Sequence, residues 1–163
     1  MFLKKYLNAY KIYILLLIVS SSILIRGIPE YPVINFITYL FIHILLIYMG
    51  IYHFKITLYF VYFISGIVFD IFLLNEIGTH ILTLMILILI MSQIKKFIIS
   101  FSSRQVFILI AIILFFTILS EMFISLILFN FSFNVFTLIK SIFIFLFISY
   151  PTFYLFNKID RFG

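Results

Sequence analysis

Three ionisable residues stand inside otherwise apolar stretches of the chain: Asp70, Glu121 and Lys140. A charge at the centre of a bilayer costs roughly 2.5–3.5 kcal/mol on insertion scales, so such groups are usually paired and face other helices. Counted from the neighbouring polar turns, their depths differ by only about 4–5 Å at 1.5 Å per residue, which a lysine stem can cover. We therefore expect a buried charge cluster in which Lys140 bonds to Glu121 or to Asp70. The alternative is that each side chain reaches the membrane interface separately.

The histidines point only weakly to a catalytic or metal site. His80 follows a turn that holds Glu76 and lies near Asp70 in the sequence, so two carboxylates and an imidazole can meet there. The spacing is unlike that of a zinc motif such as H-E-x-x-H, and cysteine is absent. Neither a nucleophile triad nor a phosphate-binding loop is visible, and the buried charges lie at one depth rather than across the membrane. We expect no enzyme activity, no metal and no cofactor.

The elements that position these residues are expected to be membrane spans. The chain has 163 residues, of which 66% are hydrophobic and 10% charged, against about half and about a quarter in a soluble domain. At roughly 20 residues per span, the length accommodates about six spans. This excludes a separate soluble catalytic or nucleic-acid-binding domain. The net charge of +6 is explained by the excess of lysine and arginine that the cytoplasmic loops of a membrane protein carry.

Charges and turn residues divide the chain at regular intervals. The long apolar run through the second and third segments is too long for one helix in a bilayer of about 30 Å, so we expect a tight reversal near Gly50–Lys55. The predicted fold is an all-α integral membrane protein with short loops and a single polytopic domain, 1–163. Its expected spans are about 10–26, 32–53, 56–74, 79–95, 105–128 and 135–156.

The basic residues fall almost entirely on one side of this six-span topology. That side carries the loops with Lys55 and with Lys95, Lys96 and Arg104, whereas only Arg26 falls on the other side. The positive-inside rule then predicts that both termini are cytoplasmic. The basic N-terminus also resembles the start of a secretory signal, but no A-x-A-like site follows it, so we expect a retained first span.

A short segment around Asp70 carries the most specific spacing. Gly66 and Asp70 are four residues apart and share a helix face, which predicts that a neighbouring helix approaches closely and supplies a donor to Asp70. Gly78 is placed for a positive φ in the following turn, and Thr79 is expected to cap the next helix. Taken alone, each glycine is better explained by ordinary packing than by a functional site.

This segment, Gly66-Ile-Val-Phe-Asp70-Ile-Phe-Leu-Leu-Asn-Glu-Ile-Gly78-Thr-His-Ile-Leu, resembles the signature of the rod shape-determining MreD family. That signature is a G-x-x-x-D followed, after a short gap, by L/I-G and an apolar helix. Pro32 at the start of the second span and Tyr150-Pro151 before a basic C-terminal end match the family's layout. The stretch 74–77 departs from it, because a small turn with Gly or Ser is common there.

The resemblance implies a non-enzymatic membrane scaffold of the bacterial elongation (rod) complex, located in the bacterial cytoplasmic (inner) membrane. Such a scaffold binds MreC and works with the MreB filament, and with RodA and its transpeptidase, to direct lateral peptidoglycan synthesis. The implied six-helix fold is similar to the substrate-binding components of energy-coupling-factor transporters. Gly66 and Asp70 would set a helix crossing, and the basic loops would face lipid headgroups or filament.

One alternative function stays open at this point, a vitamin-binding component of such a transporter. The cluster of Asp70, Glu121 and Lys140 would then lie in the floor of an outward-facing pocket. Those components usually dock through an Ala-x-x-x-Ala face on the first span, and the first span here has no alanine. The scaffold is therefore the preferred interpretation.

Overall fold

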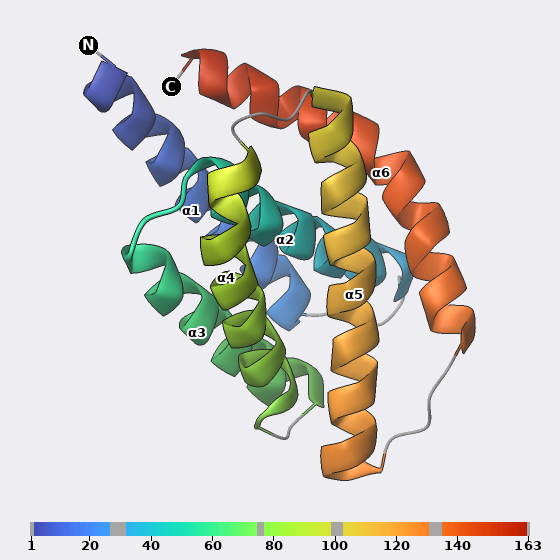
Figure 1. The fold of residues 1–163 in the computed structure, drawn as a ribbon. Helices are drawn as coiled ribbons and strands as arrows, with labels where there is room; N and C mark the ends of the chain where they lie inside the picture. The colour runs from blue at the N-terminus through green and yellow to red at the C-terminus, as the bar shows by residue number, and fades with distance from the viewer. Residues whose placement is uncertain (1, 27–31, 75–76, 99–102, 131–134, 163) are drawn as a thin grey trace. The chain divides into compact units, whose positions relative to one another are not determined.

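The computed structural model describes residues 2–26, 32–74, 77–98, 103–130 and 135–162, and these residues are helical apart from short turns (Figure 1). The described helices are α1 (Phe2–Arg26), α2 (Pro32–Tyr52), α3 (Thr57–Phe69), the π-helix η1 (Asp70–Leu74), α4 (Thr79–Ile98), α5 (Ser103–Phe129) and α6 (Val135–Phe162). The predicted all-α class is confirmed. The helices coincide with the six segments expected from the sequence, and α1 and α6 extend beyond them toward the termini.

Four of the described helices are long and apolar enough to cross a membrane. These segments are Ala9–Arg26, Pro32–Tyr52, Gln105–Phe129 and Leu138–Asp160. Two further apolar segments, Thr57–Leu73 and Thr79–Ile94, are shorter. A helix needs about 20 apolar residues to span the hydrocarbon core, so the four long helices give the chain the character of a multi-pass membrane protein.

The chain reverses between α2 and α3, as the sequence predicts. The His53 N–H donates to the Met49 carbonyl at 2.9 Å and completes the last turn of α2. The Leu58 N–H donates to the Lys55 carbonyl at 2.9 Å as α3 begins. At the far end of α5, Asn130 has φ 55°, a left-handed conformation that asparagine tolerates and that ends the helix.

The chain forms two compact units, Met1–Leu45 with Lys140–Gly163, and Leu46–Ile139. In the first unit, the Tyr13 hydroxyl of α1 donates to Asp160 Oδ1 of α6 at 2.8 Å. The ring of Tyr13 also meets Phe156 edge to face, with centroids 5.5 Å apart. These contacts bring the first turns of the apolar segment Ala9–Arg26 to the end of the apolar segment Leu138–Asp160.

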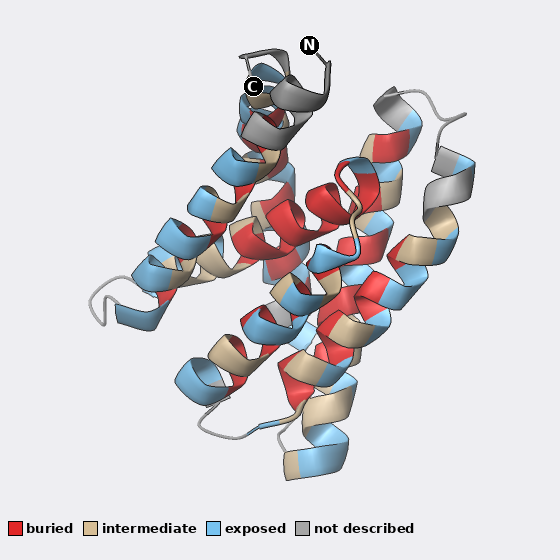
Figure 2. Ribbon diagram, turned by 90° about the vertical axis from the view of Figure 1, so that its left-hand side faces the viewer, coloured by how far each residue is buried: buried red, intermediate tan, exposed pale blue. Residues whose placement is uncertain are grey.

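In the second unit, α4 lies between α3 and α5 (Figure 1). The Tyr62 hydroxyl of α3 donates to the Leu46 carbonyl and joins α3 to the end of α2. Figure 2 shows that buried and exposed positions form separate stripes along the helices. On α4 the exposed stripe is itself apolar, for example at Leu89 and Ile90. A helix that is apolar on every side fits a lipid surrounding rather than water.

Candidate functional site

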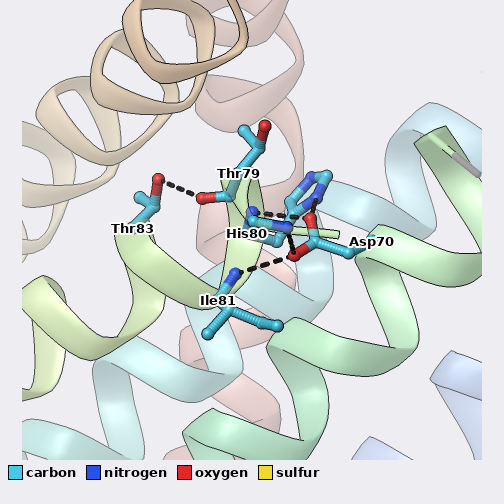
Figure 3. Close-up of polar contacts among 6 residues, drawn as sticks. Asp70, Thr79, His80, Ile81 and Thr83 are labelled. Atoms are coloured by element: carbon cyan, nitrogen blue, oxygen red, sulfur yellow. Dashed lines mark hydrogen bonds and ion pairs between the residues drawn. The ribbon is translucent and has the colours of Figure 1, made fainter. Parts of the chain in front are cut away.

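The most elaborate polar site in the described chain begins where α3 changes into the π-helix η1 at Asp70. Single π-turns inside helices are rare and often occur at functional sites. The Asp70 N–H donates to the carbonyls of Gly66 and Ile67, which keeps the backbone continuous with α3. Asp70 is fully buried, and its carboxylate points toward the first turn of α4 (Figure 3).

Four donors from one short segment surround the Asp70 carboxylate. Oδ2 accepts from the Gly78 N–H at 2.7 Å and from the Ile81 N–H at 3.2 Å. Oδ1 accepts from the His80 N–H at 2.7 Å and lies 2.9 Å from His80 Nδ1. An ionised carboxylate only accepts hydrogen bonds, so this geometry places the ring proton of His80 on Nδ1. The four lone-pair positions of the carboxylate are thereby filled.

This arrangement is a helix cap supplied by another helix. The first backbone N–H groups of a helix have no partner within it, and a negative charge near them is favoured by the helix dipole. Here the carboxylate at the end of α3 binds the backbone N–H groups that begin α4. A buried carboxylate without such partners would be strongly destabilising. The contact therefore gives the buried carboxylate of Asp70 its hydrogen bonds and also fixes the start of α4.

Thr79 does not make the predicted cap. Its hydroxyl is buried and has no hydrogen-bond partner among the described residues. Figure 3 shows the side chain of Thr79 pointing away from Asp70. The prediction is wrong because the two N–H groups that a Thr79 cap would need have other acceptors: Ile81 N–H donates to Asp70 Oδ2, and Leu82 N–H donates to the Gly78 carbonyl at 3.0 Å. Thr79 instead contributes its carbonyl, which accepts the Thr83 hydroxyl at 2.9 Å.

Gly66 lies at a close approach between α3 and α4. A Cβ atom at Gly66 would lie 2.7 Å from the Ile81 Cα and 2.9 Å from the Ile81 nitrogen. These are backbone atoms, so they cannot move aside as the end of a side chain can. The structure thus has the close approach that the spacing of Gly66 and Asp70 predicts, with the donors to Asp70 coming from the same turn of α4.

Gly78 has φ +144°, a conformation that side chains with a Cβ rarely adopt. This agrees with the positive φ expected in the turn. The glycine places its own N–H on Asp70 Oδ2 and lets the chain enter α4 immediately afterwards. Asn75 and Glu76, the most unusual part of this turn relative to the MreD-like pattern, lie outside the described residues.

His80 binds Asp70 directly, which its position in the sequence indicated only weakly. Its backbone and ring both bind Asp70, and its ring meets Phe69 edge to face with centroids 5.7 Å apart. No group of three His, Asp or Glu side chains within the described ranges is arranged to hold a metal ion. With its acceptor positions filled, Asp70 is suited to holding a helix in place rather than to acid–base or metal chemistry.

The three residues of the predicted charge cluster, Asp70, Glu121 and Lys140, belong to two different units of the chain. Glu121 is buried on α5 in the second unit, and Lys140 is the exposed first residue of the α6 portion that belongs to the first unit. The donors to Asp70 that are described above come from residues 78–81 and do not include Lys140. The pairing of Lys140 with Glu121 or Asp70 therefore stays a prediction.

The basic loops lie at helix ends. Lys55 lies in the turn between α2 and α3 and is half-buried. Lys95 and Lys96 belong to the last turn of α4, and Arg104 belongs to the first turn of α5. All four residues are therefore placed at reversals of the chain, where a membrane protein carries its interfacial charges.

A second close contact joins α2, α3 and α4, and sequence reasoning missed it. A Cβ atom at Gly50 would lie 2.8 Å from the Tyr62 hydroxyl oxygen and 3.0 Å from Met91 Cγ. The Tyr62 hydroxyl itself donates to the Leu46 carbonyl, one turn before Gly50 on α2. The signal in the sequence was one glycine within an apolar run, which is too common to identify a packing site.

Comparison with known proteins yields no relative for this arrangement. No protein-family model, no curated protein and no solved structure matches the chain. The site is therefore interpreted from its own geometry: a glycine that admits a helix, a buried carboxylate that caps it, and a second glycine that allows the turn between them.

Proposed function

We propose that the chain is a non-enzymatic membrane scaffold of the bacterial elongation complex, of the kind that the MreD family supplies. One observation carries the proposal: the residues of the MreD-like pattern, Gly66, Asp70 and Gly78, act together at a single helix junction. Gly66 admits the backbone of α4, Asp70 caps it, and Gly78 makes the turn. A spacing pattern whose members have such linked roles is more specific than three unrelated residues.

The proposed topology has six spans, with both termini in the cytoplasm of a bacterium. The distribution of basic residues supports it. The contact between Tyr13 and Asp160 also supports it, because it brings the first turns of the apolar segment Ala9–Arg26 to the end of the apolar segment Leu138–Asp160. The short apolar segment Thr79–Ile94 is part of α4, which has 20 residues. At 1.5 Å per residue α4 is about 30 Å long, which is enough to span the hydrocarbon core. The helix formed by α3 and η1 is accommodated by slight thinning of the bilayer.

The scaffold role follows from the way the polar groups are used. Asp70 is engaged by backbone N–H groups, and several serine and threonine hydroxyls donate to carbonyls of their own helices, as at Thr117 and Thr152. The acceptor sites of Asp70 and the hydroxyl protons of these residues are therefore used within the protein itself. The apolar faces that the described helices expose, such as Phe60 and Phe147, offer surfaces for lipid and for the transmembrane parts of MreC and RodA.

The vitamin-transporter alternative has less support. Its pocket would use Asp70 in the floor, yet the acceptor positions of this carboxylate are filled by residues 78–81. It remains the other outcome that the crosslinking experiment below distinguishes.

Depletion in a rod-shaped host tests the scaffold role. Loss of the protein is expected to shorten and widen the cells and to stop lateral wall synthesis, measured by the length-to-width ratio and by fluorescent wall labelling. Wild-type protein and the matched control Ile67→Leu are expected to restore rods. Gly66→Leu is expected not to restore them, because its side chain collides with the backbone of Ile81. Normal rods after depletion would contradict the proposal.

Crosslinking in cells tests the partners. Photoreactive residues replace exposed positions of α1, such as Leu15 and Ile18, and positions in the connection between α4 and α5. Capture of a single-span MreC-like protein or of wall-synthesis enzymes supports the scaffold. Capture of a transporter's membrane subunit with its ATPases would instead favour the vitamin-binding alternative.

A further inference from the structure

An open groove between α4 and α5 lies apart from the site at Asp70. Its volume is ≈ 420 Å³, and its walls include Ile86 and Ile90 from α4 and Ile112 and Phe116 from α5. All four of these side chains are exposed. The volume is within the range of about 300–1,000 Å³ that is typical of ligand sites.

The chemistry of the groove is that of hydrocarbon. Three hydroxyl groups line it, and each donates to a carbonyl of its own helix: Thr83 to Thr79 at 2.9 Å, Thr117 to Ile113 at 2.8 Å and Ser120 to Thr117 at 2.7 Å. Their protons are therefore engaged already. The remaining lining is aliphatic apart from Phe116. A polar metabolite would lose its hydration in this groove without gaining hydrogen bonds, whereas an acyl chain would not.

The length of the groove matches one leaflet of a bilayer. On α4 it extends from Thr83 to Ile94, and on α5 from Leu109 to Ser120. At 1.5 Å per residue each of these segments is about 16 Å long, which is close to half of a hydrocarbon core of about 30 Å. The groove therefore has the reach of one acyl chain rather than that of a membrane-spanning helix.

Three basic residues follow one end of the groove in the sequence. Ile94 and Leu109 mark that end, and the sequence places Lys95, Lys96 and Arg104 directly beyond them, at the end of α4 and the start of α5. Basic sites between transmembrane helices on the cytoplasmic side bind anionic lipid headgroups. The opposite end, at Thr83 and Ser120, has no lysine or arginine within four positions of either residue in the sequence.

We propose that this groove binds one acyl chain of an anionic phospholipid, with the phosphate near the end of α4 that carries Lys95 and Lys96 and the start of α5 that carries Arg104. The apolar walls select hydrocarbon, the length selects one leaflet, and the three cations select a negative headgroup. This lipid site goes beyond the scaffold role and does not depend on it, since it requires only that α4 and α5 lie in a membrane.

Native mass spectrometry of the full chain in mild detergent tests the proposal, with phosphatidylglycerol and phosphatidylcholine of identical acyl chains offered together. Wild-type protein is expected to retain phosphatidylglycerol about tenfold over phosphatidylcholine, because each nearby basic residue adds attraction to an anionic headgroup. Equal retention of the two lipids, or retention of neither, would overturn the proposal.

Two kinds of variant separate the groove from its charges. Ile90→Trp with Ile112→Trp fills the groove and is expected to abolish retention of both lipids. The matched control, Leu89→Trp with Ile108→Trp, changes residues of similar exposure on the same helices and is expected to retain the wild-type preference. Equal loss in both pairs would contradict a site in the groove.

Lys95→Gln with Lys96→Gln and Arg104→Gln is expected to remove the preference for phosphatidylglycerol while lipid is still retained. Lys4→Gln with Lys5→Gln and Lys11→Gln removes the same charge elsewhere and is expected to keep the preference. Loss of the preference in this second triple variant would overturn the assignment of the headgroup.

A photoreactive residue at position 112 identifies the occupant in cells. An adduct of phospholipid mass supports the proposal, whereas an adduct with a protein would mean that a helix occupies the groove. Since the scaffold role is judged by cell shape, either result leaves that proposal to its own test.

Discussion

At the scale of single residues, Asp70 shows how a membrane protein can bury a carboxylate at low cost. The charge is not neutralised by one basic side chain but shared among backbone N–H groups and one imidazole. Hydrogen bonds to an ionised group are shorter and stronger than neutral ones, and the surrounding apolar medium strengthens them further. Asp70 therefore stabilises the junction only while all of its donors stay in place.

Asp70→Asn should destabilise the protein. An amide replaces one acceptor oxygen with a donor, which then faces backbone N–H groups, and the charge is lost. We expect the free energy of unfolding to fall by about 1–3 kcal/mol, measured by far-UV circular dichroism during titration of micelles with SDS. Tryptophan fluorescence is not an option because the chain has no Trp.

The control for this change is Asp160→Asn on α6. The Tyr13 hydroxyl donates to Asp160 Oδ1, and the asparagine carbonyl can still accept that hydrogen bond. We expect only a small loss of stability. A loss as large as that of Asp70→Asn would show that the shared cap does not distinguish Asp70 from Asp160, a half-buried acid that accepts one side-chain hydrogen bond.

At the scale of helices, Gly50 and Gly66 each lie where a neighbouring helix leaves no room for a side chain. The two contacts differ in kind, because the neighbour of Gly66 is the backbone of Ile81 and the neighbours of Gly50 are the ends of the Tyr62 and Met91 side chains. Backbone atoms in two packed helices cannot yield independently. The spacing between α3 and α4 is therefore set more strictly than that between α2 and its neighbours.

Gly66→Ala should lower the free energy of unfolding by about 1–3 kcal/mol, because the added methyl group separates α3 from α4. The loss is expected although alanine has the higher helix propensity by about 1 kcal/mol. Gly50→Ala should cost less, since Tyr62 and Met91 can shift. The same SDS titration measures both variants, and a larger loss for Gly50→Ala would contradict this ranking.

The pairing of α1 with α6 depends on a different kind of contact. Tyr13 is fully buried, and its hydroxyl reaches Asp160. Tyr13→Phe keeps the ring against Phe156 and removes this hydrogen bond, so we expect a loss of about 0.5–1.5 kcal/mol in the free energy of unfolding. Tyr150→Phe on α6, where the side chain is 80% exposed, is expected to have no measurable effect; equal losses would argue against the α1–α6 contact.

At the scale of the whole molecule, the proposed six-span topology is open to a direct test because the chain has no cysteine. Single cysteines can replace Lys55 and Ser100 on the expected cytoplasmic side, and Asn75 and Ser132 on the other side. A membrane-impermeant maleimide is applied to intact cells whose outer membrane is absent or has been removed. It should label only positions 75 and 132. Labelling of positions 55 and 100 should require permeabilisation, and their labelling in intact cells would contradict the topology.

The sequence by itself determined the helical class, the places where the chain reverses and the two glycines of the Asp70 segment. These features are local. A run of apolar residues in a bilayer must form a helix because its backbone has no other hydrogen-bond partner, and charges or turn residues must fall at its ends. The four-residue spacing of Gly66 and Asp70 fixes a shared face in the same way.

Only the tertiary structure decided which residue caps α4, what surrounds Gly50 and where a groove opens. Sequence favoured Thr79 as the cap because a neighbouring hydroxyl is the usual choice. In the structure, the carboxylate of Asp70, where α3 changes into the π-helix, accepts from the N–H groups of His80 and Ile81 instead. That outcome depends on how closely two helices approach, and Gly66 sets this distance through the atoms of Ile81. Contacts between segments far apart in the chain have no local signal, so the groove between α4 and α5 appears only once both helices are packed.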